Sequence, residues 1–222
     1  MKSEKRIILT KDGSHTLYID SLNEYYHSRY GAIQESNHVF ISNGLELIDN
    51  KEIEVLEVGF GTGLNALLTF IAAKKDQKNI HYDAIELFPL ENSLVDKLNF
   101  TTFLDTVNHE FLMSLHKLQW NQVHKLNDFF ILHKMLKDYN HFIPEKQYHV
   151  IYFDAFAPEK QPEMWNEQNF KKLFYALQTN GLMVTYCAKG EIKRRLKKIG
   201  FTVKLVEGPP GKHEMIRAVK PG

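Results

Sequence analysis

The residues with the clearest chemical potential form a glycine-rich segment, Glu57-Val58-Gly59-Phe60-Gly61-Thr62-Gly63-Leu64-Asn65. It follows a short apolar stretch and precedes a helical pattern, so we expect it where a strand passes into a helix. Glycines at such a junction permit a tight turn and let a ligand approach the backbone, and the start of the helix offers unpaired N–H groups to an anion. The segment therefore predicts a binding loop, with a tight turn that binds nothing as the alternative.

The spacing of the glycines separates the ligand classes. A dinucleotide-binding fingerprint requires its third glycine at position 64, where the chain has Leu64. No Lys-Ser/Thr pair follows the glycines, which disfavours a nucleoside-triphosphate loop. Glu57 is expected to face the positive sulfonium or ammonium group of S-adenosyl-L-methionine (SAM). The residues predicted to bind this cofactor from the loop are Glu57, Gly59, Gly61, Gly63 and Asn65.

A second acidic residue, Glu86, ends the next predicted strand, 23 residues after Gly63. A carboxylate at this position can accept hydrogen bonds from both hydroxyl groups of a ribose, and it would repel the 2′-phosphate of NADP. Glu86 and the adjacent Leu87 are therefore predicted cofactor contacts. A solvated strand end is the alternative interpretation.

A third motif, Phe153-Asp154-Ala155-Phe156-Ala157-Pro158, follows the predicted strand 148–154. Ligands of open α/β sheets bind at the carboxyl ends of such strands. A carboxylate there can orient an amine nucleophile and take its proton, so Asp154 is the predicted catalytic residue and also a predicted cofactor contact. A helix cap or a turn residue is the alternative.

Strands and helices alternate along most of the chain, which predicts a parallel sheet covered on both faces. We predict strands over residues 52–58, 80–86, 129–133, 148–154, 181–187, 201–206 and 214–219. We predict helices over residues 63–75, 89–98, 163–178 and 190–199, with a helical insertion over 100–127. No helix separates the last two strands, so they should pair antiparallel.

The predicted fold class is α/β, a doubly wound Rossmann-like SAM-dependent methyltransferase fold with a mostly parallel sheet and an antiparallel C-terminal hairpin. Residues 5–20 predict an additional β-hairpin, because two β-rich stretches flank an Asp-Gly turn. Residues 1–50 are accordingly expected to form a small N-terminal hairpin and helical extension, and residues 51–222 the methyltransferase domain.

Composition and charge limit the function further. The chain has 222 residues, 43% of them hydrophobic, and a single cysteine, so a disulfide scaffold and a thiolate metal site are excluded and a reducing cytoplasm is expected. No apolar run approaches the roughly 20 residues that cross a bilayer, so we expect no membrane partner. The 11 histidines show no metal-binding spacing, so no metal is expected.

Positive charge is concentrated at the C-terminal end. Residues 189–222 contain ten Lys/Arg and three Asp/Glu, whereas the whole chain has a formal charge of only +1. Such asymmetry is typical of a nucleic-acid-binding face or of a solvated helix. The residues predicted to bind nucleic acid are Lys189, Lys193, Arg194, Arg195 and Lys212. Tyr26, Phe156 and Trp165 are candidates for stacking on a base, with packing in the core as the alternative interpretation of each.

Together these motifs resemble the MnmC-type tRNA methyltransferases, in the stand-alone MnmD form. The resemblance rests on residues 57–65, on residues 154–158 with Met164-Trp165, and on residues 208–215, and it extends over Tyr26-His27-Ser28 and residues 35–40 near the start. It covers nearly the whole chain, from about Asp12 to Lys220.

The resemblance implies methyl transfer from SAM to the amine of 5-aminomethyl-2-thiouridine at the tRNA wobble position, giving 5-methylaminomethyl-2-thiouridine. It implies the tRNA anticodon stem-loop as partner, no FAD, and separate enzymes that make the amine. One departure is that the predicted third strand ends in Ile131-Leu132-His133-Lys134, without the acidic residue that many SAM enzymes place against adenine. The rivals are a SAM-fold enzyme for small amines (an N-methyl- or aminopropyltransferase), a non-catalytic tRNA- or SAM-binding module, and an NAD-dependent oxidoreductase.

Overall fold

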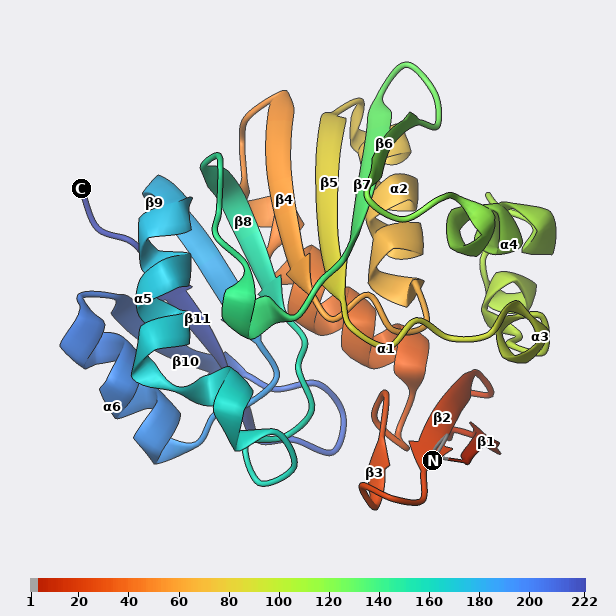
Figure 1. Cartoon of the computed structure of the whole chain (residues 1–222), viewed down its shortest axis with the longest axis horizontal. Helices are drawn as coiled ribbons and strands as arrows, with labels where there is room; N and C mark the ends of the chain where they lie inside the picture. The colour runs from red at the N-terminus through yellow and green to blue at the C-terminus, as the bar shows by residue number, and fades with distance from the viewer. Residues whose placement is uncertain (1–3) are drawn as a thin grey trace.

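A computed structural model describes residues 4–222 and contains two separate sheets. The larger sheet has eight strands in the order β10-β11-β9-β8-β4-β5-β7-β6 (Figure 1). Its strands are β4 Glu52–Val58, β5 Asn79–Glu86, β6 Gln122–Lys125, β7 Phe130–Leu136, β8 Tyr148–Phe153, β9 Leu177–Thr185, β10 Thr202–Glu207 and β11 Glu214–Val219. Strands β7, β5, β4, β8 and β9 run parallel, whereas β6, β11 and β10 are antiparallel to their neighbours. This confirms the predicted fold class, including the antiparallel C-terminal hairpin.

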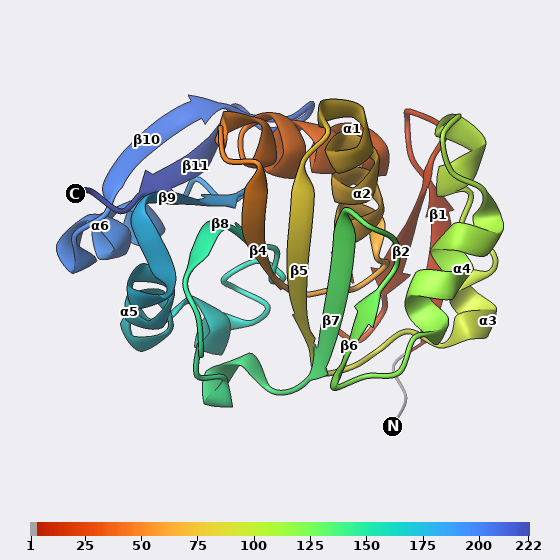
Figure 2. The same cartoon turned by 90° about the horizontal axis from the view of Figure 1, so that it is seen from above.

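Helices cover both faces of the large sheet. The helices are α1 Ala32–Ser36, α2 Leu64–Asp76, α3 Asn92–Val95, α4 His109–Lys117, α5 Glu167–Ala176 and α6 Gly190–Ile199. A π-helical turn, Asn37–Ser42, extends α1, and short 3-10 helices occur at Leu45–Leu47, Phe100–Phe103, Tyr139–His141 and Pro162–Trp165. Seen from above, α1 and α2 lie on one face and α5 and α6 on the other (Figure 2).

The alternation of side chains along the strands explains the two layers. In β4, Val55 packs into the core beneath α2, whereas Leu56 and Val58 pack into the core beneath α5 and α6. Helix α6 is amphipathic in the same sense, because Ile192 and Leu196 are fully buried while Arg194, Lys197 and Lys198 are exposed. No helix among residues 4–222 is long and apolar enough to span a membrane.

The N-terminal residues form the smaller sheet. Strands β1 Lys5–Leu9 and β2 His15–Ile19 are an antiparallel hairpin, as predicted, and a short third strand, β3 Glu24–Tyr25, pairs with β2. Residues 1–3 of the predicted extension lie outside the described residues. Figure 1 shows this sheet next to the carboxyl ends of β4 and β5, on the edge where ligands of α/β sheets bind.

Three regions differ from the helices that the sequence predicts. The helix predicted over 163–178 is divided into the 3-10 helix Pro162–Trp165 and α5, and β9 already begins at Leu177. The helix predicted over 89–98 shrinks to α3, Asn92–Val95, because asparagine, serine and aspartate in this stretch favour turns over helix. Residues 100–127 contain only a 3-10 turn and α4, and they end in strand β6. The side chain of Asn108 accepts a hydrogen bond from the N–H of Phe111 and so starts α4 as a new helix after the polar stretch 105–108.

Candidate active site

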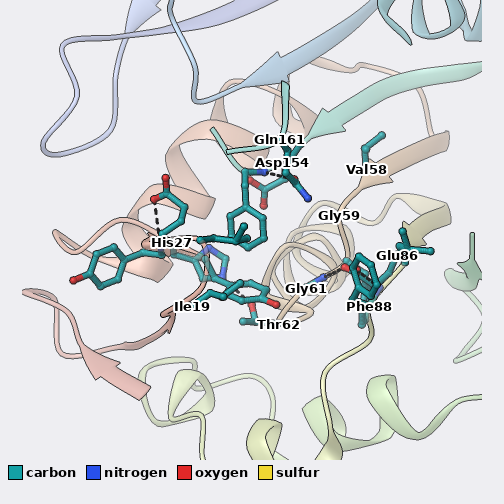
Figure 3. A pocket seen from close by; sticks show the side chains of 18 of the residues that line it. Ile19, His27, Val58, Gly59, Gly61, Thr62, Glu86, Phe88, Asp154 and Gln161 are labelled. Atoms are coloured by element: carbon teal, nitrogen blue, oxygen red, sulfur yellow. Dashed lines mark hydrogen bonds between the residues drawn. The ribbon is translucent and has the colours of Figure 1, made fainter. Parts of the chain in front are cut away.

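A cavity of about 1610 Å³ opens at the carboxyl edge of the large sheet. Its walls come from the glycine loop, from residues 85–97, 136–140 and 154–164, and from residues 19–29 of the N-terminal sheet and the segment after it. Figure 3 shows His27, Asp154 and Glu86 around Gly59, Gly61 and Thr62. Small-molecule sites usually occupy about 300–1,000 Å³, so this cavity has room for two ligands.

The glycine loop requires glycine at its three positions. Gly59, Gly61 and Gly63 have φ angles of 98°, 47° and 72°, in the left-handed region that other residues rarely adopt. A Cβ on Gly59 would lie 2.7 Å from the carbonyl oxygen of Asp154, and one on Gly63 would lie 2.8 Å from Nε2 of His116. The loop is therefore packed tightly from behind, and its front lines the cavity.

Two buried histidines hold the loop at Thr62. Neither had a role predicted from the sequence, where His27 entered only within the motif Tyr26-His27-Ser28. His27 places Nε2 2.7 Å from Oγ1 of Thr62, and His116 donates from Nε2 to the carbonyl oxygen of Thr62 over 3.0 Å. Burial lowers the pKa of each ring to about 4, so both are neutral at pH 7. Lys134 is fully buried, with its ammonium nitrogen 4.5 Å from the centre of the Trp120 ring. It supports His116 by donating a hydrogen bond to the backbone carbonyl oxygen of that residue.

Glu86 is fixed against the loop from the end of β5. Its Oε2 accepts a hydrogen bond from the N–H of Gly61 (3.0 Å), and its Oε1 accepts one from the N–H of Phe88 (2.8 Å). Each carboxylate oxygen can accept a further hydrogen bond on the side of the cavity, which Glu86 and the exposed Leu87 line.

Asp154 follows β8 and lines the cavity opposite Glu86. Its Oδ2 accepts a hydrogen bond from Nδ2 of Asn65 (2.8 Å). Desolvation and the negative charge of Glu35 raise the pKa of Asp154 to about 7, against the lowering effect of Asn65 and of the Lys212 ammonium group. Asn65 also lines the cavity, as predicted for a cofactor contact.

Glu57 does not lie where the sequence analysis expected it. Its side chain is fully buried and is not among the residues that line the cavity. Nδ2 of Asn65 donates to its Oε1 over 2.9 Å, so Asn65 stands between Glu57 and the cavity. Burial, and then the nearby Asp154, raise the pKa of Glu57 well above its usual value, so this group does not supply the negative charge expected to face a sulfonium.

Aromatic residues and an ion pair form the wall beyond Asp154. The ring of Tyr26 lies edge-on to Phe156 with centroids 5.1 Å apart, and both line the cavity. Lys212 donates to Oε1 of Glu35 over 2.6 Å, and its ammonium lies 3.8 Å from the centre of the Tyr186 ring. Lys212 is therefore held inside the cavity instead of standing free on a surface, as a phosphate contact would require.

The other residues predicted to bind nucleic acid are placed differently. Trp165 is 1% exposed and packs on Phe153 in the core, so it is not available for stacking on a base; its Nε1 donates to the carbonyl oxygen of Phe156. Lys189 forms an ion pair with Glu159, and Arg195 donates to the carbonyl oxygen of Trp165.

Lys193 and Arg194 remain on the outer surface of α6. Neither residue is among those that line the cavity. The structure therefore brings Tyr26, Phe156 and Lys212 together at the cavity and leaves the basic residues of α6 outside it.

Strand β7, the third parallel strand along the chain, extends further than the predicted strand 129–133. Strand β7 continues to Leu136 because its alternate side chains Phe130, Leu132 and Lys134 are buried, and the chain then reaches Asp138. Asp138 lines the cavity, and its Oδ1 accepts hydrogen bonds from the backbone and side chain of Asn140. An acidic residue thus stands beyond the end of this strand, further along the chain than the sequence interpretation looked for it.

Residues 100–221 match the model of a family of S-adenosyl-L-methionine-dependent methyltransferases. The chain belongs to this family. The cavity fits the cofactor, since Gly59 and Gly61 leave the loop without side chains, Glu86 offers two acceptor oxygens, and the buried Oδ1 of Asn65 has no hydrogen-bond partner among the described residues. No group of three or more His, Cys, Asp or Glu side chains in residues 4–222 is arranged to hold a metal ion.

Curated relatives share most of this chain. It is 29% identical to the tRNA 5-methylaminomethyl-2-thiouridine biosynthesis bifunctional protein MnmC of Pseudoalteromonas atlantica, over 90% of this chain and 31% of that protein. It is 27% identical to the protein of the same name from Burkholderia multivorans, over 90% of this chain and 33% of that protein. The chain therefore spans about a third of the length of these relatives.

Solved structures show the same fold. MNMC2 from Aquifex aeolicus superposes with a TM-score of 0.80 at 24% identity, over 100% of this chain and 71% of that one. Spermidine synthase from Thermotoga maritima superposes with a TM-score of 0.64 at 15% identity, over 98% of this chain and 69% of that one.

Replacing Glu86 tests the cofactor side of the cavity. We expect Glu86→Ala to weaken SAM binding about tenfold or more, because hydrogen bonds to a charged acceptor contribute about 1.5–3 kcal/mol each. Isothermal titration calorimetry measures the change. Glu52→Ala, an exposed glutamate at the opposite end of β4, is the control and should leave the affinity unchanged. An unchanged affinity in Glu86→Ala would contradict the assignment.

Proposed function

We propose that this methyltransferase acts on tRNA and methylates the exocyclic amine of 5-aminomethyl-2-thiouridine at the wobble position. The methyl-transfer part of the proposal rests on the position of Asp154. Its carboxylate lines a cavity that is large enough for a cofactor and an acceptor nucleotide together. The tRNA part is supported by the printed names of the MnmC relatives, which match 90% of this chain. The product would be 5-methylaminomethyl-2-thiouridine.

We propose the following division of the cavity. The glycine loop, Asn65, Glu86 and Leu87 hold SAM, with Glu86 accepting from the ribose hydroxyl groups. Asp138, which follows β7 and lines the cavity, is the acidic residue that we assign to the adenine amine. Tyr26, Phe156 and Lys212 border the acceptor nucleotide on the far side of Asp154.

When bound, SAM would supply a methyl group on a positively charged sulfur, so the carbon is already activated, and the S–C bond that breaks as the N–C bond forms would leave the neutral thioether S-adenosylhomocysteine. The work of the protein is to place a neutral amine in line with that carbon at about 3 Å. Asp154 accepts a hydrogen bond from the amine, and its negative charge stabilises the positive charge that develops on nitrogen as the new bond forms. The same carboxylate then accepts the proton that the methylated amine releases.

A second acceptor for the amine is the hydroxyl oxygen of Tyr26. The carbonyl oxygens of the loop after Asp154 are already engaged: that of Ala155 accepts from the Tyr186 hydroxyl, and that of Phe156 accepts from Trp165. Tyr26 lines the cavity against Gly61, and its ring would be 3.2 Å from a Cβ there.

We also propose the two-part organisation of the chain. Strands β4–β11 make one sheet after residue 51, and strands β1–β3 make a separate one before it. Residues 1–50 are then an extension that closes the site of the methyltransferase domain, residues 51–222.

The assignment of tRNA is tested with radiolabelled SAM. Purified protein is incubated with tRNA from cells that lack this modification, and the tRNA is digested to nucleosides. We expect the label in 5-methylaminomethyl-2-thiouridine. Label only in added small amines would support a small-amine transferase, aminopropyl transfer being tested with decarboxylated SAM, and SAM binding without transfer to any acceptor would support a non-catalytic module.

Replacing Asp154 separates catalysis from cofactor binding. Asp154→Asn keeps the size of the side chain but removes its charge, so we expect turnover to fall about 100-fold or more. The affinity for SAM should stay within about threefold of the wild-type value. Equal turnover in the variant and the wild type would exclude the role of Asp154.

The pKa of Asp154, raised to about 7, predicts the pH dependence. The carboxyl group must be ionised to stabilise the cation, so kcat/KM should rise with pH through about 7 and fall below it as Asp154 takes up a proton. Deprotonation of the acceptor amine should produce a second, separate rise in kcat/KM at higher pH. Asp154→Asn should remove the limb near the pKa of Asp154 and keep the amine limb, which a pH–rate series on both proteins measures. The same lower limb in both proteins would assign that titration to another group.

A further inference from the structure

One polar cluster of the described residues lies behind the cavity and has no part in the function proposed above. Glu57 near the end of β4 is fully buried, and its two carboxyl oxygens differ in their hydrogen bonding. Oε1 accepts the hydrogen bond from Nδ2 of Asn65, whereas Oε2 has no partner among the described residues. The Tyr82 hydroxyl on β5 is equally buried and makes no hydrogen bond to another described residue; it lies beside Glu57, whose pKa burial raises and Tyr82 lowers by a smaller amount.

Asn65 joins this cluster to Asp154. Its single Nδ2 group has two hydrogens, and it donates to Glu57 over 2.9 Å and to Asp154 over 2.8 Å. The side-chain amide is therefore fully oriented by two carboxyl groups, one behind it and one at the cavity. Rotation of the amide by half a turn would present Oδ1 to both carboxyl groups and break both hydrogen bonds.

The surroundings of Glu57 offer no cation among the described residues to balance a negative charge. The titratable groups that face it are Tyr82 and Glu86 from β5, and Tyr152 and Asp154 from β8. An isolated carboxylate in such a place costs far more than a neutral carboxylic acid, and a second carboxylate joined through one amide increases that cost. A proton on Oε2 would remove the charge and would allow this oxygen to donate to the hydroxyl oxygen of Tyr82.

We propose that Glu57 is a positioning residue that, as a neutral acid, fixes Asn65 so that its amide hydrogen holds the Asp154 carboxylate toward the acceptor. The inference rests on the proposed role of Asp154. The cluster then carries one negative charge, on the group that meets the amine. Glu57 acts through Asn65 and does not touch either substrate.

The variant Glu57→Gln tests the neutral state directly. A glutamine side chain has the shape of a protonated glutamate, with an oxygen for Asn65 and a donor for Tyr82. We expect its turnover and its SAM affinity to stay within about threefold of the wild-type values. If Glu57 instead faced the cofactor as an anion, Glu57→Gln would weaken SAM binding tenfold or more, which calorimetry would detect and which would overturn the proposal.

The variant Glu57→Leu tests the positioning role. It fills the site but offers no acceptor, so Asn65 is free to turn and Asp154 loses its partner. We expect kcat to fall about 10- to 100-fold, as for the loss of a group that orients an active-site side chain, and SAM affinity to fall by a smaller factor, because Asn65 also contacts the cofactor in the proposed division of the cavity. A turnover equal to that of the wild type would contradict the role, and rescue by glutamine distinguishes it from general damage.

The protonation state of Glu57 also affects how the thermal stability of the protein depends on pH. A carboxyl group whose pKa is higher in the folded than in the unfolded protein stabilises the fold less as pH rises above its unfolded pKa. Glutamine does not titrate, so Tm of Glu57→Gln minus Tm of the wild type should be higher at pH 8 than at pH 5 by about 3 °C or more. Differential scanning calorimetry measures this. A difference that does not change with pH would show that Glu57 is ionised in the folded protein.

Glu54→Gln is the matched control for the stability series. It makes the same change in the same strand, at a carboxylate paired with Lys146 and His81, and should show no such gain at pH 8.

One readout does not depend on methyl transfer. The hydrogen bond from Asn65 lowers the pKa of Asp154, so NMR of 13C-labelled aspartate should show a higher pKa in Glu57→Leu but not in Glu57→Gln. If the wild type transfers no methyl group to tRNA, the proposed function fails on that result, while this titration still decides whether Glu57 positions Asp154. An unchanged Asp154 titration in Glu57→Leu would overturn the positioning role.

Discussion

The site depends on the parallel pairing of β4 with β8. The N–H of Asp154 donates to the carbonyl oxygen of Val58 over 3.0 Å, which continues the ladder beyond the last paired residues of the two strands. This contact brings the glycine loop and Asp154 so close that a Cβ on Gly59 would lie 2.7 Å from the Asp154 backbone. The glycine loop and the Asp154 carboxylate are therefore parts of one rigid sheet edge, and their separation is set by backbone hydrogen bonds.

Burial then decides how charge is distributed at that edge. Glu57 and Asp154 share the amide of Asn65, and only Asp154 opens to the cavity. Burial raises the pKa of both carboxyl groups, and Asp154, which borders the cavity, is the one that we propose to ionise, although the two groups lie at the ends of neighbouring strands. The same desolvation keeps His27 and His116 neutral where they hold Thr62, so these two rings fix the loop by hydrogen bonds and add no positive charge that would oppose a sulfonium.

Sequence patterns were sufficient for features that depend on local chemistry. The strand Glu52–Val58, the helix Gly190–Ile199 and the C-terminal hairpin follow directly from apolar spacing and glycine positions. Contacts between distant segments were not accessible in this way. The sequence left Trp165 open between base stacking and the core, because the order of residues does not reveal that Phe153 and Phe170 enclose it. Asp138 was missed because burial of alternate residues extends β7 beyond its most apolar part.

Residues of the proposed N-terminal extension line the cavity of the methyltransferase domain, so the two parts of the chain build one site. Tyr26 and His27 reach the glycine loop, and Glu35 holds Lys212, which arrives from the loop between β10 and β11. Gly211 of that loop packs so closely on Tyr30 that a Cβ would contact the ring at 2.2 Å. The cavity wall at the glycine loop is thus built from the edge of the large sheet. The opposite wall is built from two segments joined by the ion pair of Glu35 with Lys212, residues that are 177 positions apart in the chain. Neither of these segments contributes a strand to the parallel part of the sheet. Tyr26 and His27 nevertheless join this opposite wall to the glycine loop, so the segments that border the acceptor in our proposal also support the loop that borders the cofactor.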